Sequence, residues 1–134
     1  MLDLNKIQTD TYTFSLVLPD GTVHDDVKIT VRGDNHPKVK EVARKLLLEG
    51  ENRRSHAKRR GKKDNDPLTE DELEYLEEAG LKRAVSRVES MKGLMEDGKE
   101  IGADEALIGA ALKKYGWLLT LVMEEAGDAV NFCS

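Results

Sequence analysis

The sequence predicts an α+β fold in which an N-terminal β-hairpin precedes a mainly α-helical part of three to four helices. Two observations predict it. Apolar residues alternate with polar ones near the N-terminus, and they recur at three- and four-residue spacing beyond residue 37. A length of 134 residues is most simply one domain, 1–134, with room for one hydrophobic core but not for two.

The predicted hairpin spans residues 11–32. Apolar and polar side chains alternate from Tyr12 to Leu18, as in a half-buried strand, and apolar residues recur at even spacing again up to Val31. Between the two runs, Pro19-Asp20-Gly21-Thr22 has the composition of a tight turn. Because an isolated hairpin is marginal in water, we expect a helix or a second subunit to cover its apolar face.

The first long helix is predicted over residues 37–50. Asn35 or His36 can cap it, and Pro37 fits its first turn at no cost in hydrogen bonds. Apolar residues then follow at helical spacing to about residue 49, and Gly50 is expected to loosen the helix.

A charged segment, 51–67, is predicted to be a mobile linker or a frayed helical extension. It contains a basic run from Arg53 to Lys63, with seven Lys or Arg residues and no acid. Eight acids then follow between Asp64 and Glu78 without one base. The sign of the charge therefore changes at a single point of the chain.

The helical part is predicted over residues 68–132. Thr69 and Glu72 have capping-box spacing, and the helix that they open is expected to continue to about Met95. Asp104 can cap a further helix, and Gly116 separates it from the last one. No strand is predicted in this half.

The residues show no pattern typical of an enzyme, a metal site or a cofactor site. The three histidines lack the spacing of a zinc motif, Cys133 has no histidine partner, and no Gly-rich phosphate loop is present. The acidic run lacks the central glycine of a calcium-binding loop. No apolar stretch approaches the ~20 residues that span a bilayer, so we expect a soluble, intracellular protein.

Two surfaces remain as candidates for binding. The basic run is compatible with phosphate binding, with a solvated linker or with charge-driven contact to a protein. Two features argue against nucleic-acid binding: the acidic run beside it, and the lack of aromatic residues between the basic residues. Val17, Trp117 and Phe132 are hard to place in a small core, so we expect some of them to contact a partner.

The order of motifs resembles the tail assembly chaperones of long-tailed, lambda-like bacteriophages and prophages. The hairpin with its Pro-Asp-Gly turn, the segment 33–37 opening a basic helix and the Asp97-Gly98-Lys99 turn occur in that order. An acid-capped helix at Asp104, an aromatic step at Tyr115 and Trp117 and the closing Asn131-Phe132 follow. The chain departs from the family pattern in having Met91-Lys92-Gly93-Leu94 where a Trp is frequent, and Cys133 where a second aromatic is frequent.

The resemblance implies a non-enzymatic protein of virion assembly that acts in the host cytoplasm and is absent from the finished particle. It implies binding to the tape measure protein, which is kept soluble, and recruitment of the major tail tube protein, in some members through an extension added by ribosomal frameshifting. We expect a homo-oligomer with no membrane partner. The residues expected to contact partners are Leu107, Leu112, Tyr115, Trp117, Leu118, Leu121 and Phe132.

Two alternatives stay open. One is a small nucleic-acid-binding regulator that uses the basic segment 53–63. The other is a structural minor tail protein that is retained in the virion.

Overall fold

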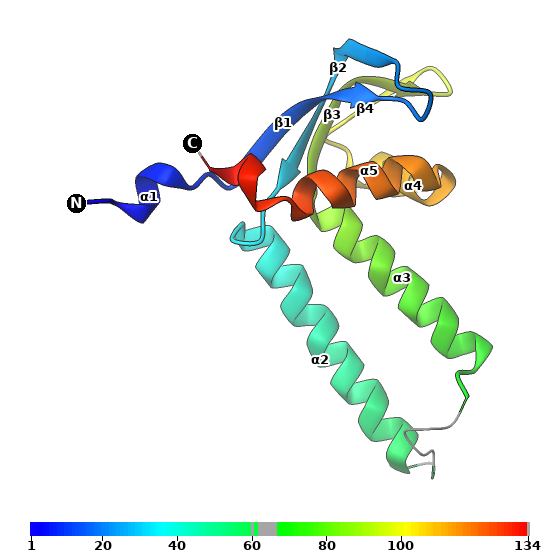
Figure 1. Cartoon of the computed structure of the whole chain (residues 1–134). Helices are drawn as coiled ribbons and strands as arrows, with labels where there is room; N and C mark the ends of the chain where they lie inside the picture. The colour runs from blue at the N-terminus through cyan, green and yellow to red at the C-terminus, as the bar shows by residue number, and fades with distance from the viewer. Residues whose placement is uncertain (60, 62–66, 134) are drawn as a thin grey trace.

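A computed structural model describes residues 1–59, 61 and 67–133, and it has the predicted α+β fold. Four antiparallel strands form one sheet in the order β1-β2-β3-β4. The strands are β1 (Thr11–Val17), β2 (Val23–Arg32), β3 (Val88–Glu96) and β4 (Lys99–Gly102). The sheet lies at one end of the molecule, and two long helices extend away from it (Figure 1).

The first two strands form the predicted hairpin. Tyr12 lies opposite Val31 and Phe14 opposite Ile29 in its register. In the connecting turn, the Asp20 side chain accepts a hydrogen bond of 2.9 Å from the backbone N–H of Thr22. This bond holds the pKa of the Asp20 carboxyl below its usual value, because it stabilises the charged form.

Strands β3 and β4 correct the prediction that one helix continues to Met95 and that this half contains no strand. The helix ends at Ser86, and residues 88–96 form β3, of which residues 88–92 pair with β2. A Cβ on Gly93 would lie 2.4 Å from the carbonyl oxygen of Asp26, so glycine lets β3 approach β2 closely here. Asp97 and Gly98 both have positive φ, at 51° and 79°, which is the geometry of a tight hairpin turn.

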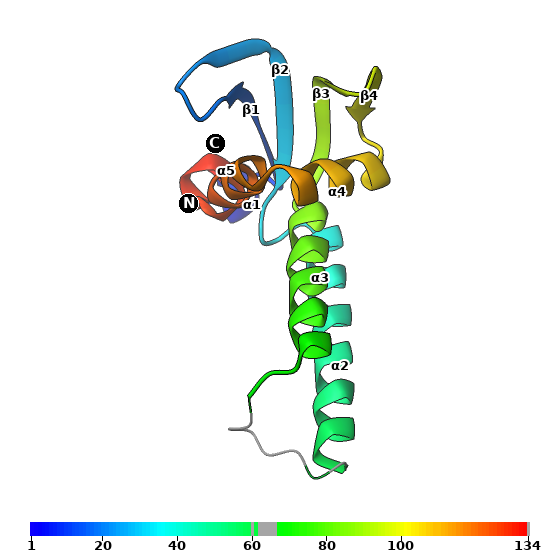
Figure 2. The same cartoon turned by 90° about the vertical axis from the view of Figure 1, so that its right-hand side faces the viewer.

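Helices α2 (Pro37–Arg59) and α3 (Glu70–Ser86) form an antiparallel pair that we call the arm (Figures 1 and 2). Helix α2 is longer than predicted, since it passes through Gly50 and includes residues 51–59 of the expected linker. One glycine costs a helix only about 1 kcal/mol, and contacts to α3 can offset that cost. The rest of the predicted linker, 60 and 62–66, lies outside the described residues.

Helices α4 (Glu105–Lys114) and α5 (Gly116–Gly127) lie across one side of the sheet, followed by the 3₁₀ turn η1 (Ala129–Phe132) (Figure 2). We call the sheet with these three elements the head. Its core joins the inward face of the hairpin to α4 and α5, with Ile29, Val31 and Ile108 fully buried. A short helix, α1 (Leu4–Ile7), projects from the head near both termini (Figure 1).

The helix caps follow the predicted residues. The backbone N–H of Lys38 donates to Nδ1 of His36, and that of Glu72 donates to the Thr69 hydroxyl. The Asp104 carboxylate accepts from the N–H groups of Ala106 and Leu107. Each cap satisfies backbone donors that have no partner within their own helix.

Candidate partner-binding groove

The seven residues predicted to contact a partner mostly serve the core of the head. Leu112, Leu118 and Phe132 are buried, at 1%, 2% and 6% exposure. Leu107, Tyr115 and Leu121 are half-buried against that core. Of the seven, Trp117 alone is exposed, at 37%. Partner contact thus stays a prediction for the accessible members, whereas the three buried leucine and phenylalanine side chains face the interior.

The C-terminal aromatic is held by the chain itself. Phe132 lies edge-on to Tyr12, with ring centroids 6.4 Å apart, and its ring closely approaches Gly33. Its carbonyl oxygen accepts a 2.8 Å hydrogen bond from the N–H of Thr9. Phe132 therefore closes the head against β1, and the chain itself covers its ring.

A charged cluster ties the end of β3 to the end of α4. Lys114 Nζ lies 2.7 Å from Glu96 Oε1, and the Tyr115 hydroxyl donates to the same carboxylate at 3.0 Å. The Lys114 contact, followed by the tyrosine hydrogen bond, lowers the pKa of Glu96 and the carboxylate in turn raises the pKa of Lys114. The cluster therefore links the end of β3 to the C-terminal end of α4 within the head.

A groove of about 670 Å³ lies at the base of the arm, where α2, α3 and α4 meet. Its apolar lining comes from Val42 and Leu46 on α2 and from Leu81 and Val85 on α3. An apolar floor between two helices is the surface that an amphipathic helix of a partner can occupy.

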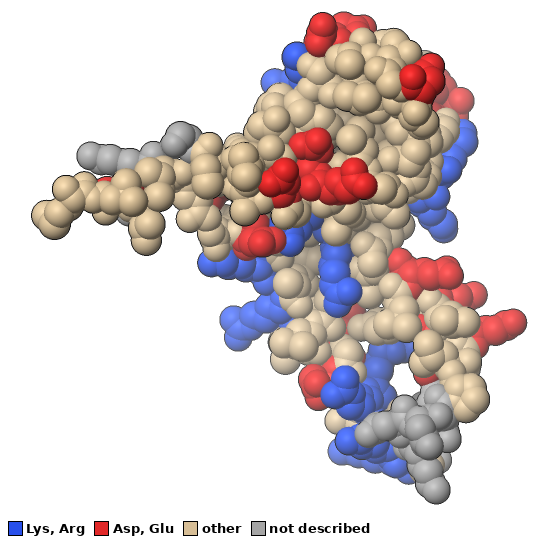
Figure 3. All heavy atoms as spheres, in the orientation of Figure 1, with Lys and Arg blue, Asp and Glu red and all other residues tan. Residues whose placement is uncertain are grey.

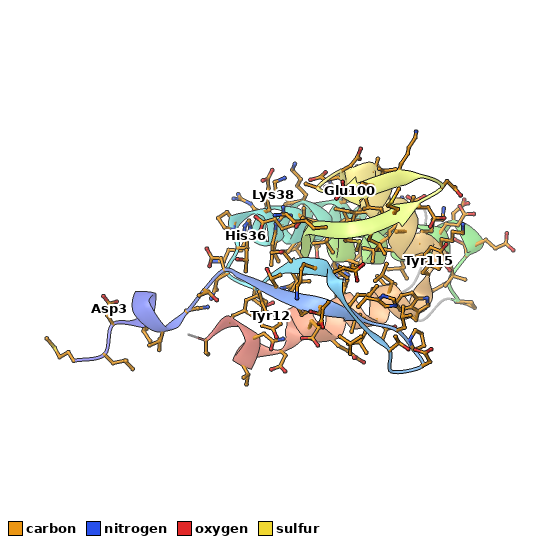
Figure 4. All side chains as sticks on the ribbon, turned by 90° about the horizontal axis from the view of Figure 1, so that it is seen from above. Asp3, Tyr12, His36, Lys38, Glu100 and Tyr115 are labelled. Carbon is orange, nitrogen blue, oxygen red and sulfur yellow. The ribbon has the colours of Figure 1, made fainter. Side chains whose placement is uncertain are left out.

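Charged side chains frame this groove. Lys38 pairs with Glu105 at 3.2 Å, and Lys45 pairs with Glu41 at 3.2 Å. Figure 4 shows Lys38 beside His36 at the start of α2, far from Tyr115. Such exposed pairs contribute little stability, and they keep the rim of the groove solvated.

Arg32, the last residue of β2, lines the groove where the head meets the arm. It is 8% exposed, and its Nη1 donates to the backbone oxygen of Ser86 at 3.1 Å. Its Nε is buried and has no hydrogen-bond partner among the described residues. A buried N–H without an acceptor is unfavourable, so this junction of the head and the arm carries an energetic cost.

The two charge runs lie beside one another in the arm. Arg53 stacks over the ring of Tyr75 on α3 at 4.1 Å, and Arg54 pairs with Glu51 at 3.4 Å. On the face shown in Figure 3, basic side chains gather over α2 and acidic ones over α3. The change of sign along the sequence thus becomes a basic helix packed on an acidic helix. Arg60, Lys62 and Lys63 lie outside the described residues.

The arm also exposes four leucines. Leu73 and Leu76 on α3 are 46% and 52% exposed, and Leu47 and Leu48 on α2 are 65% and 57% exposed. Their exposure could not be predicted from the sequence. An amphipathic stripe does not reveal whether the surface that packs on it belongs to the same chain.

The remaining polar candidates are separate from one another. His24 lies 3.8 Å from Asp26 in β2, His36 caps α2, and the exposed Cys133 donates its S–H to the Ala129 oxygen. Within residues 1–59, 61 and 67–133, no three His, Cys, Asp or Glu side chains gather as metal ligands would. Among the described helices, none alone has the length and apolar composition of a membrane span, and α4 and α5, which reach it together, are bent by 113°.

No protein-family model, curated protein or solved structure matches the chain.

Proposed function

We propose that the protein is a phage tail assembly chaperone that binds the tape measure protein and keeps it soluble. It would also help to recruit tail tube subunits, in the host cytoplasm, without being retained in the virion. The groove between α2 and α3 is the observation that carries the proposal, because it combines an apolar floor with a charged rim. The order of sequence motifs that resembles this family supports the same assignment.

The physical argument starts from the client. A long helical protein with apolar faces aggregates when these faces meet at high local concentration. A groove floored by Val42, Leu46, Leu81 and Val85 can cover one turn or two of such a face. The 35% of charged residues in the chaperone then keeps the complex in solution. Many copies along the client would be needed to cover its length.

Co-expression with the tape measure protein tests the proposal. That protein should be encoded nearby as a very long helical reading frame, preceded by an overlapping −1 frame if a frameshifted form exists. Soluble tape measure protein is expected only in the presence of the chaperone. If it is equally insoluble with and without the chaperone, the proposal fails.

Variants locate the client on the surface. Leu81→Asp places a charge in the groove and should abolish the solubilising effect, whereas Leu48→Asp changes an exposed leucine of α2 outside the groove lining and should preserve it. If both variants lose the solubilising effect equally, the groove is not the client-binding site. Fluorescence of Trp117, the only tryptophan, reports separately whether the client reaches α5.

The nucleic-acid alternative depends on the exposed basic side chains at the end of α2, among them Lys58 and Arg59. The acidic residues of α3 beside them would repel a phosphate backbone. Tight binding to DNA or RNA at low salt that weakens steeply as salt rises would favour this alternative. Mass spectrometry of purified particles addresses the minor tail protein, because a retained component would be detected there.

A further inference from the structure

The arm carries an apolar face that the chain does not cover. Leu73 and Leu76, with Gly80 one turn further, recur at helical spacing on one face of α3, and both leucines are about half exposed. On α2, Leu47 lies about half a turn from the row Glu41, Lys45 and Glu49, which lines the groove. The antiparallel geometry of the pair places Leu47 on the same side of the arm as the two α3 leucines. This leucine face is distinct from the groove.

Charges flank the leucine face asymmetrically. Along α2, the residues that share the face of Leu47 at spacings of three, four or seven include Lys40, Arg44, Arg54 and Glu51, with Lys58 one further turn along. Along α3, the exposed charged residues at the same spacings from the two leucines are Glu70, Glu77 and Arg83. Each side chain of these two sets is exposed. One half of the face is therefore mainly basic, and the other half is mainly acidic.

We propose that this face binds a second copy of the chain, so that two arms form a four-helix bundle about a two-fold axis parallel to the arm. Such an axis places α2 of each copy on α3 of the other, so the basic half of one face meets the acidic half of its partner. A two-fold axis perpendicular to the helix axes, but parallel to the plane that contains α2 and α3, would instead place α2 on α2 and α3 on α3. Like charges would then face each other. The leucines of both copies would fill the centre of the bundle.

The arm extends away from the head (Figure 1), and Leu47, Leu73 and Leu76 are exposed along it. Pairing through this face would leave the groove open, because Leu81 and Val85 lie on a different face of α3 from Leu73 and Leu76. The inference is independent of the proposed chaperone function: the chain could dimerise without binding a tape measure protein, and the reverse also holds.

Sedimentation equilibrium of the full chain tests the pairing over a range from low micromolar concentration upward. We expect a reversible dimer, and we expect Leu73→Glu with Leu76→Glu to weaken it by about tenfold or more. Val130→Glu, at a 76% exposed apolar residue of the head, is the matched control and should leave the dimer unchanged. Circular dichroism verifies that each variant is folded. A wild-type chain that stays monomeric, or a dimer that persists in the Leu73/Leu76 variant, contradicts the proposal.

A charge exchange tests which helices meet. The variant Glu70→Lys/Glu77→Lys has two basic helix faces, and the variant Arg54→Glu/Lys58→Glu has two acidic ones. Each alone should dimerise about tenfold or more weakly, whereas an equimolar mixture should form a heterodimer of wild-type stability, because both α2–α3 contacts regain opposite charges. Failure of the mixture to recover association would contradict the pairing of α2 with α3.

Discussion

The head and the arm differ in how they treat their apolar side chains. The largest fully buried side chains, such as Ile29, Met91 and Leu118, belong to the strands and to α4 and α5 of the head. The arm contributes none of them, and it exposes four leucines. The head therefore closes on itself, while the arm consists of two helices that share too little surface to cover each other. The head also exposes apolar side chains, among them Val23, Met95 and Val130. The apolar groove, however, lies at the base of the arm, and we expect binding there.

The largest expected difference between the two regions concerns leucine truncation. Leu112→Ala empties a fully buried position of the head and should lower the free energy of unfolding by about 2–5 kcal/mol. Leu76→Ala removes a half-exposed side chain of the arm and should cost below about 0.5 kcal/mol in the monomer. Denaturant titration at low protein concentration measures both. Equal losses would mean that the arm is packed as tightly as the head.

Two glycines should respond to alanine with opposite signs. Gly93 has φ of 83° and leaves no room for a Cβ beside the Asp26 carbonyl, so Gly93→Ala should destabilise the head by about 1–3 kcal/mol. Gly80 lies in α3 with no atom near its Cβ position, so Gly80→Ala should stabilise the arm by up to about 1 kcal/mol. Thermal unfolding distinguishes the two. A stabilising Gly93→Ala change would contradict the close approach of β2 and β3.

Two of the side-chain caps, one in the head and one in the arm, should affect global and local stability differently. Asp104→Ala and Thr69→Ala each remove a capping acceptor and should cost about 1 kcal/mol. Because α4 packs in the core, the first change should accelerate hydrogen exchange throughout the head. The second should accelerate exchange only in the first turns of α3. Uniform acceleration in both variants would show that the head and the arm unfold as one unit.

The smallest effect is the pH dependence of the Glu96 cluster. The pKa of Glu96 is lowered in the folded chain, so its contribution is present above the ordinary glutamate value of 4.5 and is lost as the pH falls below it. Lys114 has a raised pKa, so its contribution is present below 10.5 and is lost as the pH rises further. Glu96→Gln should therefore flatten the acid side of the stability curve. If the wild-type chain and the Glu96→Gln variant lose stability identically at low pH, the cluster does not cause the pH dependence.

Local signals in the sequence predicted much of the fold, and long-range contacts explain what they missed. The hairpin turn and the caps at His36, Thr69 and Asp104 depend on neighbouring residues, so their positions follow from the sequence. The position of strand β3 does not, because Val88, Met91 and Met95 also fit a helical period, and only pairing with β2 and β4 makes them a strand. The Asp97-Gly98 pair was the available signal for a second hairpin.

Contacts between distant segments also determine the candidate site. Phe132 is buried by Tyr12 and Gly33, about a hundred residues away along the chain, so its sequence position suggested an open surface that the fold closes. The groove likewise joins residues of β2, α2, α3 and α4, and no local motif could mark it. The charge reversal was visible in the sequence. That it produces a basic helix packed on an acidic helix became clear only from the antiparallel pairing of α2 and α3.

Hydrogen–deuterium exchange of the chain with and without a soluble tape measure fragment tests most directly whether the arm is the binding region. At equal protein concentrations, the account predicts slower exchange in 38–49 and 81–86, where the groove is lined, and little change in 107–132. Slower exchange confined to 107–132, with the arm unchanged, would contradict it and return the binding surface to the C-terminal helices.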